Sequence, residues 1–568
     1  MKQIVQSPRS GKLELVEVPA PAPAAGFVVV RNHYSVVSPG TEKQAMDFAR
    51  KSLLNKARSR PDLVKQVTRK LIQEGPLPTY RAVTTRLDVP QPLGYSCAGV
   101  VESVGEDVTG FAAGDRVACA GAGYANHAEI ISVPENLVAR VPAGVPLDKA
   151  AFATLGAISM QGLRVAEPTL GEIAAVIGLG LVGQLAVQLL IANGCRVLAI
   201  DLDPIRVKQA IDLGAHWGAA PGDDHTTWRN QATEGYGADF SMVTDASSSS
   251  APIELAADLC RMKGRISIVG STAMNLERRL FYDKELQLRM SMSYGPGRYD
   301  RRYEEVGLDY PISYVRWTEN RNLQAFLALV ETNSIDPARL DLQTVDFADA
   351  ETAYEELASG VRRSLAIVFR YGENADASRS LQLHRTAPRP AVDELGVAFV
   401  GAGNYAKGIL LPAVEKVSGV RPIEIVTATG PSARRTAEKF GYASCSTDPR
   451  SAFDNDDVGL VFIATQNDSH SDLAQRALLA GKAVWLEKPA GISIDQVDEL
   501  MAVAEQTGGF LSIGYNRRFS PHVRAVRMAF ADRRGPLSIH YVVACGSTPG
   551  GTWHTYPAVG GGRTIEEV

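Results

Sequence analysis

The sequence has few of the features that mark exported, metal-rich or membrane-bound proteins. Its six cysteines lie far apart and form no Cys-x-x-Cys pair, so neither a disulfide framework nor a zinc ribbon is indicated. No apolar run reaches the ~18 residues that a membrane span needs, and the N-terminus lacks an apolar leader segment. We therefore expect a soluble, cytoplasmic protein with reduced thiols.

Positive charge is not in excess either. The 568 residues include 59 Lys and Arg against 63 Asp and Glu, and the net charge of -4 argues against a general nucleic-acid binder. The hydrophobic share of 45% and the charged share of 21% are typical of globular proteins. A chain of this length predicts about three or four domains, or fewer large ones, with several buried cores.

One stretch in the first half contains every part of a dinucleotide-binding βαβ unit. In residues 172–215 an apolar strand leads into a glycine turn, an apolar helix and a second strand. Gly178 permits the tight bend, Gly180 lets backbone amides approach a pyrophosphate, and Gly183 allows close helix packing. Asp201 ends the second strand, where a carboxylate binds the ribose hydroxyls and repels a 2'-phosphate, so we expect NAD in this half.

A second unit of the same kind follows residues 372–394, whose Pro, Ala and Ser content predicts an interdomain linker. The next stretch, "LGVAFVGAGNYAKGILLPAV", has a glycine turn at Gly401 and Gly403, with Ala406 in the third position. Its second strand ends without an acid and is followed by a neutral and cationic group of residues, Thr427, Thr429, Ser432, Arg434 and Arg435. Such a rim accepts a 2'-phosphate, but these arginines could equally form a solvated helix face. NAD and NADP both remain open for the second half, and NADP is favoured.

Short alternating strands with glycine-rich turns, in "PLGYSCAGVVESVGEDVTGFAAGDRVACAG", precede the first unit and predict a small β-barrel. A helix and strand pattern in "VDFADAETAYEELASGVRRSLAIVFRY" returns to this barrel. With these elements, residues 1–371 resemble the medium-chain dehydrogenase/reductase superfamily, of the alcohol and sorbitol dehydrogenase type. The resemblance implies a GroES-like catalytic domain over 1–150, completed by 340–371, and a Rossmann NAD-binding domain over 151–339.

The metal ligands of that superfamily are missing. Its zinc members carry a cysteine before a Gly-Thr-Asp segment and a histidine after a glycine, where this chain has Ser38 and Pro39, and Tyr95. We therefore expect no zinc and no other metal. Hydride transfer without a Lewis acid needs a hydroxyl or imidazole relay, for which Tyr95, Ser38 and His127 are the catalytic candidates. In the alternative interpretation, Tyr95 is a hydrogen-bonded core residue and His127 lies on the surface.

A basic segment with a helical pattern is inserted between Glu42 and Gln91. Such a helix can contact a membrane or nucleic acid, but a solvated lid over the cleft is the simpler interpretation. A lid rich in Lys and Arg would suit an anionic sugar derivative, such as a sugar nucleotide or a uronic acid.

The second half contains a strand that ends in a lysine followed by a proline, "VWLEKPAG". With the loop "TQNDSH" and the later "GYNRRFSP", it resembles the Gfo/Idh/MocA family of glucose-fructose oxidoreductase and inositol dehydrogenase. The resemblance implies that Lys488 is catalytic and binds the substrate hydroxyl near the nicotinamide, while Pro489 fixes the turn. It places Pro489 and three further residues at the cofactor, Asn467, His470 and Glu487.

The end of this half looks incomplete. The family adds a mixed-sheet domain that supplies a catalytic Asp and His, whereas this chain has one expected strand, "GPLSIHYVVACG", and stops at Val568. We interpret 395–520 as a second Rossmann domain and 521–568 as the start of a truncated sheet domain. The uncovered strand edges of such a domain would be a liability for stability.

Together these patterns predict an α/β fold: a GroES-like β-barrel and a Rossmann domain, then a second Rossmann domain with an incomplete α+β sheet domain. The favoured function is a bi-modular NAD(P)-dependent oxidoreductase acting on a polyol, sugar or sugar nucleotide, with polysaccharide biosynthesis as one hypothesis. In two alternatives, only the zinc-free first half is active, or the chain is a non-catalytic dinucleotide sensor or scaffold. We expect a small-molecule substrate, no nucleic acid, no membrane span and a homo-oligomer.

Overall fold

The computed structural model describes residues 1–40, 42, 61–361, 364–384, 394–542 and 556–562. The chain divides into two compact units. The first comprises Met1–Glu17, the described part of Pro23–Arg60, and Gln91–Asp376; the second comprises Val18–Ala22, Pro61–Pro90 and the described part of Ala377–Val568. Within the described ranges, no helix is both long and apolar enough to cross a membrane.

The first unit contains a seven-stranded sheet whose strands come from both ends of the unit. Its order is β15-β16-β3-β5-β6-β8, and β7 also pairs with β3. The antiparallel pairing of β16 with β3 closes the sheet with residues from beyond the Rossmann part. The strands are β3 (Phe27–Val37), β5 (Ser96–Val104), β6 (Arg116–Ala120), β7 (Ile130–Pro134), β8 (Val138–Arg140), β15 (Leu342–Asp346) and β16 (Ala366–Arg370). A small sheet beside them contains β1 (Lys2–Gln6), β2 (Leu13–Glu17) and β4 (Gln91–Pro92).

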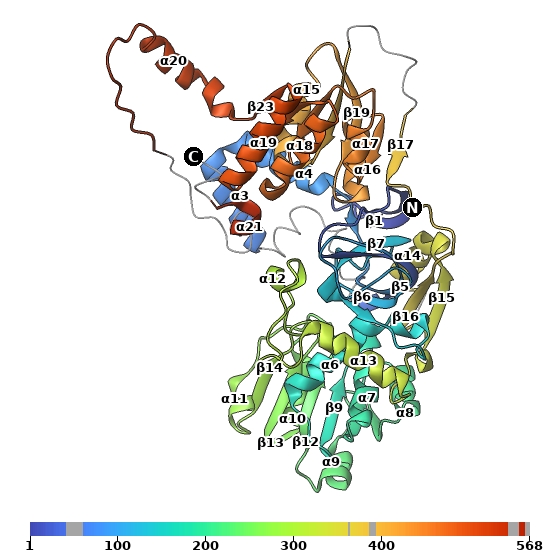
Figure 1. Cartoon of the computed structure of the whole chain (residues 1–568). Coiled ribbons are helices and arrows are strands. Elements are labelled where there is room, and N and C mark those ends of the chain that lie inside the picture. The colour runs from blue at the N-terminus through green and yellow to red at the C-terminus, as the bar shows by residue number, and fades with distance from the viewer. Residues whose placement is uncertain (41, 43–60, 362–363, 385–393, 543–555, 563–568) are drawn as a thin grey trace. The chain divides into compact units, whose positions relative to one another are not determined.

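A six-stranded parallel sheet forms the rest of the first unit, in the order β11-β10-β9-β12-β13-β14 (Figure 1). Every residue of its central strand β9 is buried, as expected for a parallel sheet with helices on both faces. The strands are β9 (Ile173–Ile177), β10 (Arg196–Ile200), β11 (Trp217–Ala219), β12 (Ala238–Val243), β13 (Cys260–Ile268) and β14 (Gln287–Met290).

The helices of the first unit cover both faces of this sheet and part of the seven-stranded one. One hydrophobic core joins the sheet to α9 and α10, and another joins it to α6, α7 and α8. The helices are α5 (Leu147–Ala150), α6 (Ala153–Ala166), α7 (Leu181–Ala192), α8 (Pro204–Asp212), α9 (Thr226–Thr233), α10 (Ala251–Leu259), α11 (Arg278–Tyr282), α12 (Arg301–Glu304), α13 (Glu319–Glu331) and α14 (Ala350–Ser359), with short turns η1 (Glu135–Leu137), η2 (Pro337–Arg339) and η3 (Phe347–Asp349).

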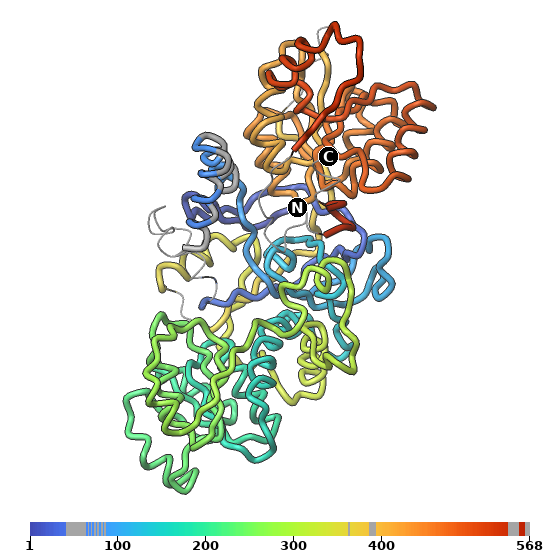
Figure 2. Tube along the Cα trace, turned by 90° about the vertical axis from the view of Figure 1, so that its left-hand side faces the viewer, coloured from blue at the N-terminus to red at the C-terminus, as the bar shows by residue number. Residues whose placement is uncertain are grey.

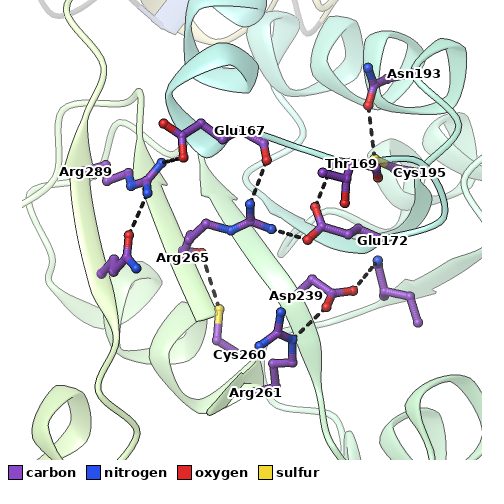
Figure 3. A network of polar contacts seen from close by, with 12 residues as sticks. Glu167, Thr169, Glu172, Asn193, Cys195, Asp239, Cys260, Arg261, Arg265 and Arg289 are labelled. Atoms are coloured by element: carbon purple, nitrogen blue, oxygen red, sulfur yellow. Dashed lines mark hydrogen bonds and ion pairs between the residues drawn. The ribbon is translucent and has the colours of Figure 1, made fainter. Parts of the chain in front are cut away.

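Charged residues join the amino ends of the parallel strands, at the opposite end of β9 from its glycine turn (Figure 3). Arg265 of β13 forms an ion pair with Glu172, which directly precedes β9. Asp239 of β12 accepts hydrogen bonds from the amide of Ile173 at 2.8 Å and from Arg261 Nε at 2.7 Å. These contacts tie three neighbouring strands together and so hold the sheet that carries the turn.

The second unit is built on a seven-stranded sheet in the order β17-β20-β19-β18-β21-β22-β23, parallel except for β17 at its edge. Helices again cover both faces, with a hydrophobic core on each. The strands are β17 (Ser380–Gln382), β18 (Leu395–Val400), β19 (Val420–Val426), β20 (Ser444–Ser446), β21 (Leu460–Ile463), β22 (Ala483–Leu486) and β23 (Leu511–Ile513). The helices are α15 (Leu411–Val414), α16 (Gly430–Phe440), α17 (Arg450–Phe453), α18 (His470–Leu479), α19 (Ile494–Thr507), α20 (Pro521–Ala529) and α21 (Pro557–Gly560), with short turns η4 (Ala406–Leu410), η5 (Asn467–Ser469) and η6 (Asn516–Phe519).

The described part of the helical insertion groups with the second unit. Its described part forms α3 (Pro61–Glu74) and α4 (Pro76–Asp88), which group with the second unit and lie beside it in Figure 2. Asp88, at the end of α4, forms an ion pair with Lys439 of α16 at 2.6 Å. This contact, together with packing of α4 against η4, holds the insertion there. Residues 43–60 of the insertion lie outside the described ranges.

Two further expectations differ from the structure. Part of the expected linker forms strand β17, because Leu381 packs into the hydrophobic core of the second unit. The strand expected in "GPLSIHYVVACG" is not formed over residues 536–542, which pair with no strand among the described residues. The described parts of 521–568 contain α20 and α21 but no sheet, so the incomplete sheet domain is not formed there. Residues 385–393 and 543–555 are not among those described.

Candidate active sites

The first glycine turn joins β9 to α7. Gly178 has a φ of +93°, and a Cβ atom there would lie 2.7 Å from the amide nitrogen of Asp245. At Gly183 a Cβ would lie 2.0 Å from the carbonyl oxygen of Gly178, so the helix packs directly on the turn. At Gly180, by contrast, nothing lies within 4 Å of an added Cβ. The fold does not need a glycine there, and the open space before the α7 N-terminus fits a pyrophosphate.

Asp201 lies at the carboxyl end of β10, next to this turn. Its carboxylate accepts hydrogen bonds from the amides of Leu179 at 2.6 Å and Asp203 at 2.9 Å, and Arg206 Nη1 lies 3.8 Å away. A carboxylate has about four acceptor positions, so these contacts leave room for ribose hydroxyls. The hydrogen bond from the Leu179 amide also fixes the glycine turn, a role of Asp201 that the sequence pattern did not indicate.

Five buried side chains form a hydrogen-bonded relay in the first unit: Ser35, Glu42, His127, Tyr354 and Tyr371. His127 Nδ1 lies 2.7 Å from Ser35 Oγ, and its Nε2 lies 3.1 Å from Glu42 Oε1. Tyr354 donates to the other oxygen of Glu42, and the Tyr371 hydroxyl lies 2.7 Å from Ser35 Oγ. Burial raises the pKa of both tyrosines well above its ordinary value, so both hydroxyls stay protonated. His127 is fully buried, so its interpretation as a surface residue is wrong.

Tyr95 and Ser38 lie near one end of this relay. Tyr95 is within electrostatic reach of Tyr354, whose pKa is raised mainly by burial and further by Glu42 and Tyr95. Ser38 is buried directly after β3, and its carbonyl oxygen accepts the amide of Glu42 at 3.0 Å. The structure therefore brings Tyr95, Ser38 and His127 into one region, with Glu42 as the connecting residue that sequence reasoning did not identify.

These side chains do not fit a catalytic zinc ion. Ser38 and Tyr95 offer hydroxyl groups, which are poor zinc ligands, and both ring nitrogens of His127 already have hydrogen-bond partners. In the part of the chain that the structure describes, no group of three His, Cys, Asp or Glu side chains could hold a metal. The expectation of a zinc-free site stays a prediction.

The second glycine turn joins β18 to η4. As in the first turn, its first glycine is required by the backbone and its middle glycine faces open space. Gly401 has a φ of +92°, and a Cβ there would lie 2.4 Å from the carbonyl oxygen of Ala464. An added Cβ at Gly403 would have nothing within 4 Å, while Ala406 is buried behind the turn. The second turn thus also presents open space to a pyrophosphate at its middle glycine.

Cationic residues gather where β19 ends. Lys407 Nζ donates to Ser432 Oγ at 3.2 Å, and both burial and the charge of Lys439 lower the pKa of Lys407. Thr429 directly precedes α16, and Arg434 of that helix pairs at 2.8 Å with the glutamate one turn later. Lys407 was not predicted from the sequence. Its spacing was a usable signal, because a residue four positions after Gly403 lies on the same face of a helix as that glycine.

The carboxyl ends of β21 and β22 bring four of the predicted residues together. His470 Nδ1 lies 2.7 Å from the carbonyl oxygen of Pro489, which follows Lys488 through a cis peptide bond. Burial lowers the pKa of His470, so the ring is neutral at physiological pH. Glu487 accepts the Lys488 amide at 3.1 Å, and burial raises its pKa. The side chain of Asn467 instead donates a hydrogen bond to the Gly560 carbonyl of α21 at 3.0 Å.

A tyrosine and an asparagine complete this edge and were not predicted from the sequence. Asn516 donates to the hydroxyl group of Tyr405, which lies in the glycine turn itself. Burial and the charge of Glu487 raise the pKa of Tyr405, which keeps its hydroxyl group protonated. Tyr405 is thus a proton-bearing group within electrostatic reach of Glu487.

Three family models match separate parts of the chain. Residues 395–515 match an oxidoreductase family with an NAD-binding Rossmann fold, residues 182–306 a zinc-binding dehydrogenase family, and residues 70–143 an alcohol dehydrogenase GroES-like domain. The matches confirm both resemblances over the segments they cover. They also confirm the α/β fold class, with NAD(P)-binding Rossmann sheets in both halves.

Individual relatives agree with this division. Inositol 2-dehydrogenase from Rhizobium meliloti is 34% identical over 136 residues, which are 24% of this chain and 40% of the relative. Sorbitol dehydrogenase from Halalkalibacterium halodurans is 26% identical over 233 residues, or 36% of this chain and 67% of the relative. An Escherichia coli oxidoreductase/dehydrogenase of unknown specificity shares the fold, with 18% identity and a TM-score of 0.50 over 66% of this chain and all of that one. The chain spans less than half the length of the inositol 2-dehydrogenase that it matches.

Proposed function

We propose that the protein is a bi-modular NAD(P)-dependent oxidoreductase acting on the hydroxyl or carbonyl group of a polyol, sugar or sugar nucleotide. The proposal rests on one observation: nothing lies within 4 Å of an added Cβ atom at the middle glycine of either turn, Gly180 or Gly403. Each lies in a turn at the carboxyl edge of a parallel sheet, directly before a helical segment, with free space where a Cβ would be. Bound NAD(P) would accept or supply the hydride in each unit.

The two units differ in the cofactor that we assign to them. Asp201 favours NAD in the first unit, because its carboxylate repels a 2'-phosphate. The second unit has no acid at the corresponding strand end, and Lys407 lies there beside Ser432, with the charge of Lys439 close by. These cations favour NADP in the second unit.

In the first unit we assign Tyr95 to the substrate hydroxyl, with Ser38 as a second hydrogen-bonding group. Glu42 and His127 act behind Tyr95 as positioning residues. The hydrogen bonds of His127 to Glu42 and to Ser35 fix the imidazole ring behind the proposed substrate position. The buried hydrogen-bonded groups thereby offer a path for the proton that alcohol oxidation releases.

In the second unit Lys488 binds the substrate hydroxyl, and the neutral imidazole of His470 holds the backbone of Pro489 in place. Tyr405 is the nearby group that holds a proton at physiological pH, since burial raises the pKa of its hydroxyl group further above the ordinary value. The relatives named above act on inositol and sorbitol, which supports a polyol or sugar substrate. A role in polysaccharide biosynthesis, a cytoplasmic location and assembly into a homo-oligomer are further parts of the hypothesis and rest on analogy.

The decisive experiment measures dinucleotide binding by titration calorimetry on the full chain and on Gly180→Ala and Gly403→Ala. We expect two dinucleotides per wild-type chain and one in each variant, with the NAD site lost in the first variant and the NADP site lost in the second. Gly144→Ala and Gly535→Ala are matched controls, because these glycines also have open space at Cβ but lie outside the turns. Unfolding temperatures should stay unchanged in all four variants.

The same proteins are then assayed for reduction of NAD and NADP with sorbitol and inositol. Turnover that disappears in the corresponding glycine variant supports the proposal. Unchanged binding stoichiometry in both variants would contradict it. Two bound dinucleotides without turnover on any polyol or sugar would favour the sensor alternative, and turnover lost in Gly180→Ala alone would favour a single active half.

A further inference from the structure

The first unit has a cavity that shares no residue with the glycine turn or with the relay. Its volume is about 840 Å³, within the range of small-molecule sites. It is lined by Asn136 of η1, by Met160 and Arg164 of α6, and by residues of α13 and of the loop before it.

Two arginines of the cavity are held by one aromatic ring. The guanidinium carbon of Arg164 lies 3.4 Å from the centre of the Trp317 ring, and that of Arg316 lies 3.9 Å from it. Arg164 Nε also donates to Asn322 of α13 at 2.8 Å, which fixes the side chain against that helix. The ring attracts both cations through its π face, and so positions them without a carboxylate.

The positive charge of this pair is not balanced by the surrounding protein. The third arginine of the cavity, Arg321, forms an ion pair with Asp309. Among the described residues, no ion pair joins Arg164 or Arg316 to an acidic side chain. Burial, and then the charge of Arg316, lower the pKa of Arg164 to about 10. Two neighbouring cations that repel each other in this way would be stabilised by a bound anion.

Amide side chains lie at the same cavity. Asn320 Nδ2 donates to the backbone carbonyls of Asn136 and Val138, which fixes its orientation at the start of α13. Gln324 Nε2 donates to Asn320 Oδ1, so the two amides form a connected pair. Both Nδ2 hydrogens of Asn320 are thereby used, so its Oδ1 can accept one further hydrogen bond, while Gln324 keeps one N–H donor and its Oε1 acceptor for the hydroxyl groups of a polyhydroxylated ligand.

We propose that this cavity binds a phosphorylated sugar or polyol, with Arg164 and Arg316 holding the phosphate group and Asn320 and Gln324 binding hydroxyl groups. A phosphate monoester carries a charge of about −1.5 to −2 at neutral pH, which matches the two uncompensated guanidinium groups. The cavity is a separate site, because it shares no residue with either dinucleotide turn.

The test is titration calorimetry of the full chain with three probes: glucose 6-phosphate, inorganic phosphate and glucose. We expect glucose 6-phosphate to bind most tightly, inorganic phosphate more weakly and glucose not measurably. Arg316→Gln and Arg164→Gln should each weaken glucose 6-phosphate binding by about tenfold or more. The matched control is Arg278→Gln, because Arg278, like Arg316, is exposed, and its guanidinium carbon lies 4.2 Å from the centre of an aromatic ring, that of Tyr282, in the same unit.

The control variant should bind glucose 6-phosphate like the wild type, and NAD binding should be the same in all four proteins. Absence of glucose 6-phosphate binding by the wild type would overturn the proposal, as would equal losses in Arg316→Gln and Arg278→Gln. Glucose that binds as tightly as its phosphate ester would overturn the role of the arginines. Inorganic phosphate that binds as tightly as the ester would overturn the role of the amides.

Discussion

Glu319 has a fully buried carboxyl group at the start of α13, and neither of its oxygens has a hydrogen-bond partner among the described residues. Burial, and then the charge of Glu304, raise its pKa to about 9, although Arg298 opposes the shift. The folded protein therefore keeps this proton at pH values where the unfolded chain, with a glutamate pKa of about 4.3, has released it. The contribution of Glu319 to stability is complete below that lower pKa and is lost as pH rises toward about 9.

Glu319→Gln keeps the shape of the side chain and removes this titration. The variant should match the wild type near pH ~4 and exceed its free energy of unfolding near pH ~8 by at least about 1.4 kcal/mol, the equivalent of one pKa unit. Urea unfolding at both pH values measures the difference. Glu331→Gln is the control, since Glu331 is exposed on the same helix. Parallel pH profiles for wild type and Glu319→Gln would show that the carboxyl group is ionised in the folded state.

Tyr95→Phe tests the relay at its substrate end. Removal of one hydroxyl group should lower the kcat/KM of NAD-dependent polyol oxidation by about a hundredfold or more, because proton transfer loses its donor and acceptor. The Kd for NAD should not change, since Tyr95 lies outside the glycine turn. Tyr236→Phe, at an exposed position of the same unit, is the control. Full activity in Tyr95→Phe would remove this residue from the proposed chemistry.

At the scale of single residues, the sequence predicts those positions whose residue type is set by the local backbone conformation. The glycine turns could be found because the tight bend at Gly178 and at Gly401 requires glycine whatever surrounds it. Glu42 and Lys407 could not be found in this way. Glu42 contacts His127, 85 positions later, and Lys407 contacts Ser432, 25 positions later, so only the folded chain shows either pair.

The elements of the first parallel sheet are joined at their amino ends by partly buried ion pairs. Arg265 and Glu172 are only 14% and 15% exposed, so loss of one partner leaves a poorly solvated charge. Arg265→Ala should therefore lower the free energy of unfolding by about 3 kcal/mol. Arg279→Ala removes an 81% exposed arginine that pairs with Asp283 and should cost less than about 1 kcal/mol. Denaturant unfolding compares the two variants, and equal losses would contradict a stabilising role for the amino-end network.

Elements with long apolar patterns agree between sequence and structure, whereas short or unpaired ones do not. β9 and β18 are continuous apolar runs that a parallel sheet buries on both faces. β17 has three residues, too few for any period to be recognised, and depends on its partner β20. The apolar pattern of residues 536–542 does predict a strand, but a strand also needs a neighbour to pair with, and the pattern cannot supply one.

At the scale of the whole molecule, the second unit is assembled from three separate segments of the chain. Thr447 donates a hydrogen bond to the carbonyl oxygen of Ala20, 427 positions earlier, and the amide of Ala20 donates to Ser378 at 2.8 Å. A Cβ at Gly430 would lie 2.4 Å from the carbonyl oxygen of Pro19. No local pattern predicts that Val18–Ala22 and Pro61–Pro90 belong to this unit, because their role depends only on these distant partners.

A fragment of residues 377–568 should consequently be less stable than the same residues in the whole chain. It lacks the hydrogen bonds to Ala20 and the ion pair of Asp88 with Lys439, which together contribute at least about 2 kcal/mol. The proper comparison is the full chain cleaved at a protease site introduced into residues 372–376, which keeps all three segments. Thermal unfolding with and without NADP measures stability and binding in both samples. A fragment that unfolds at the same temperature and binds NADP as tightly as the cleaved chain would show that the second unit does not need its two N-terminal segments.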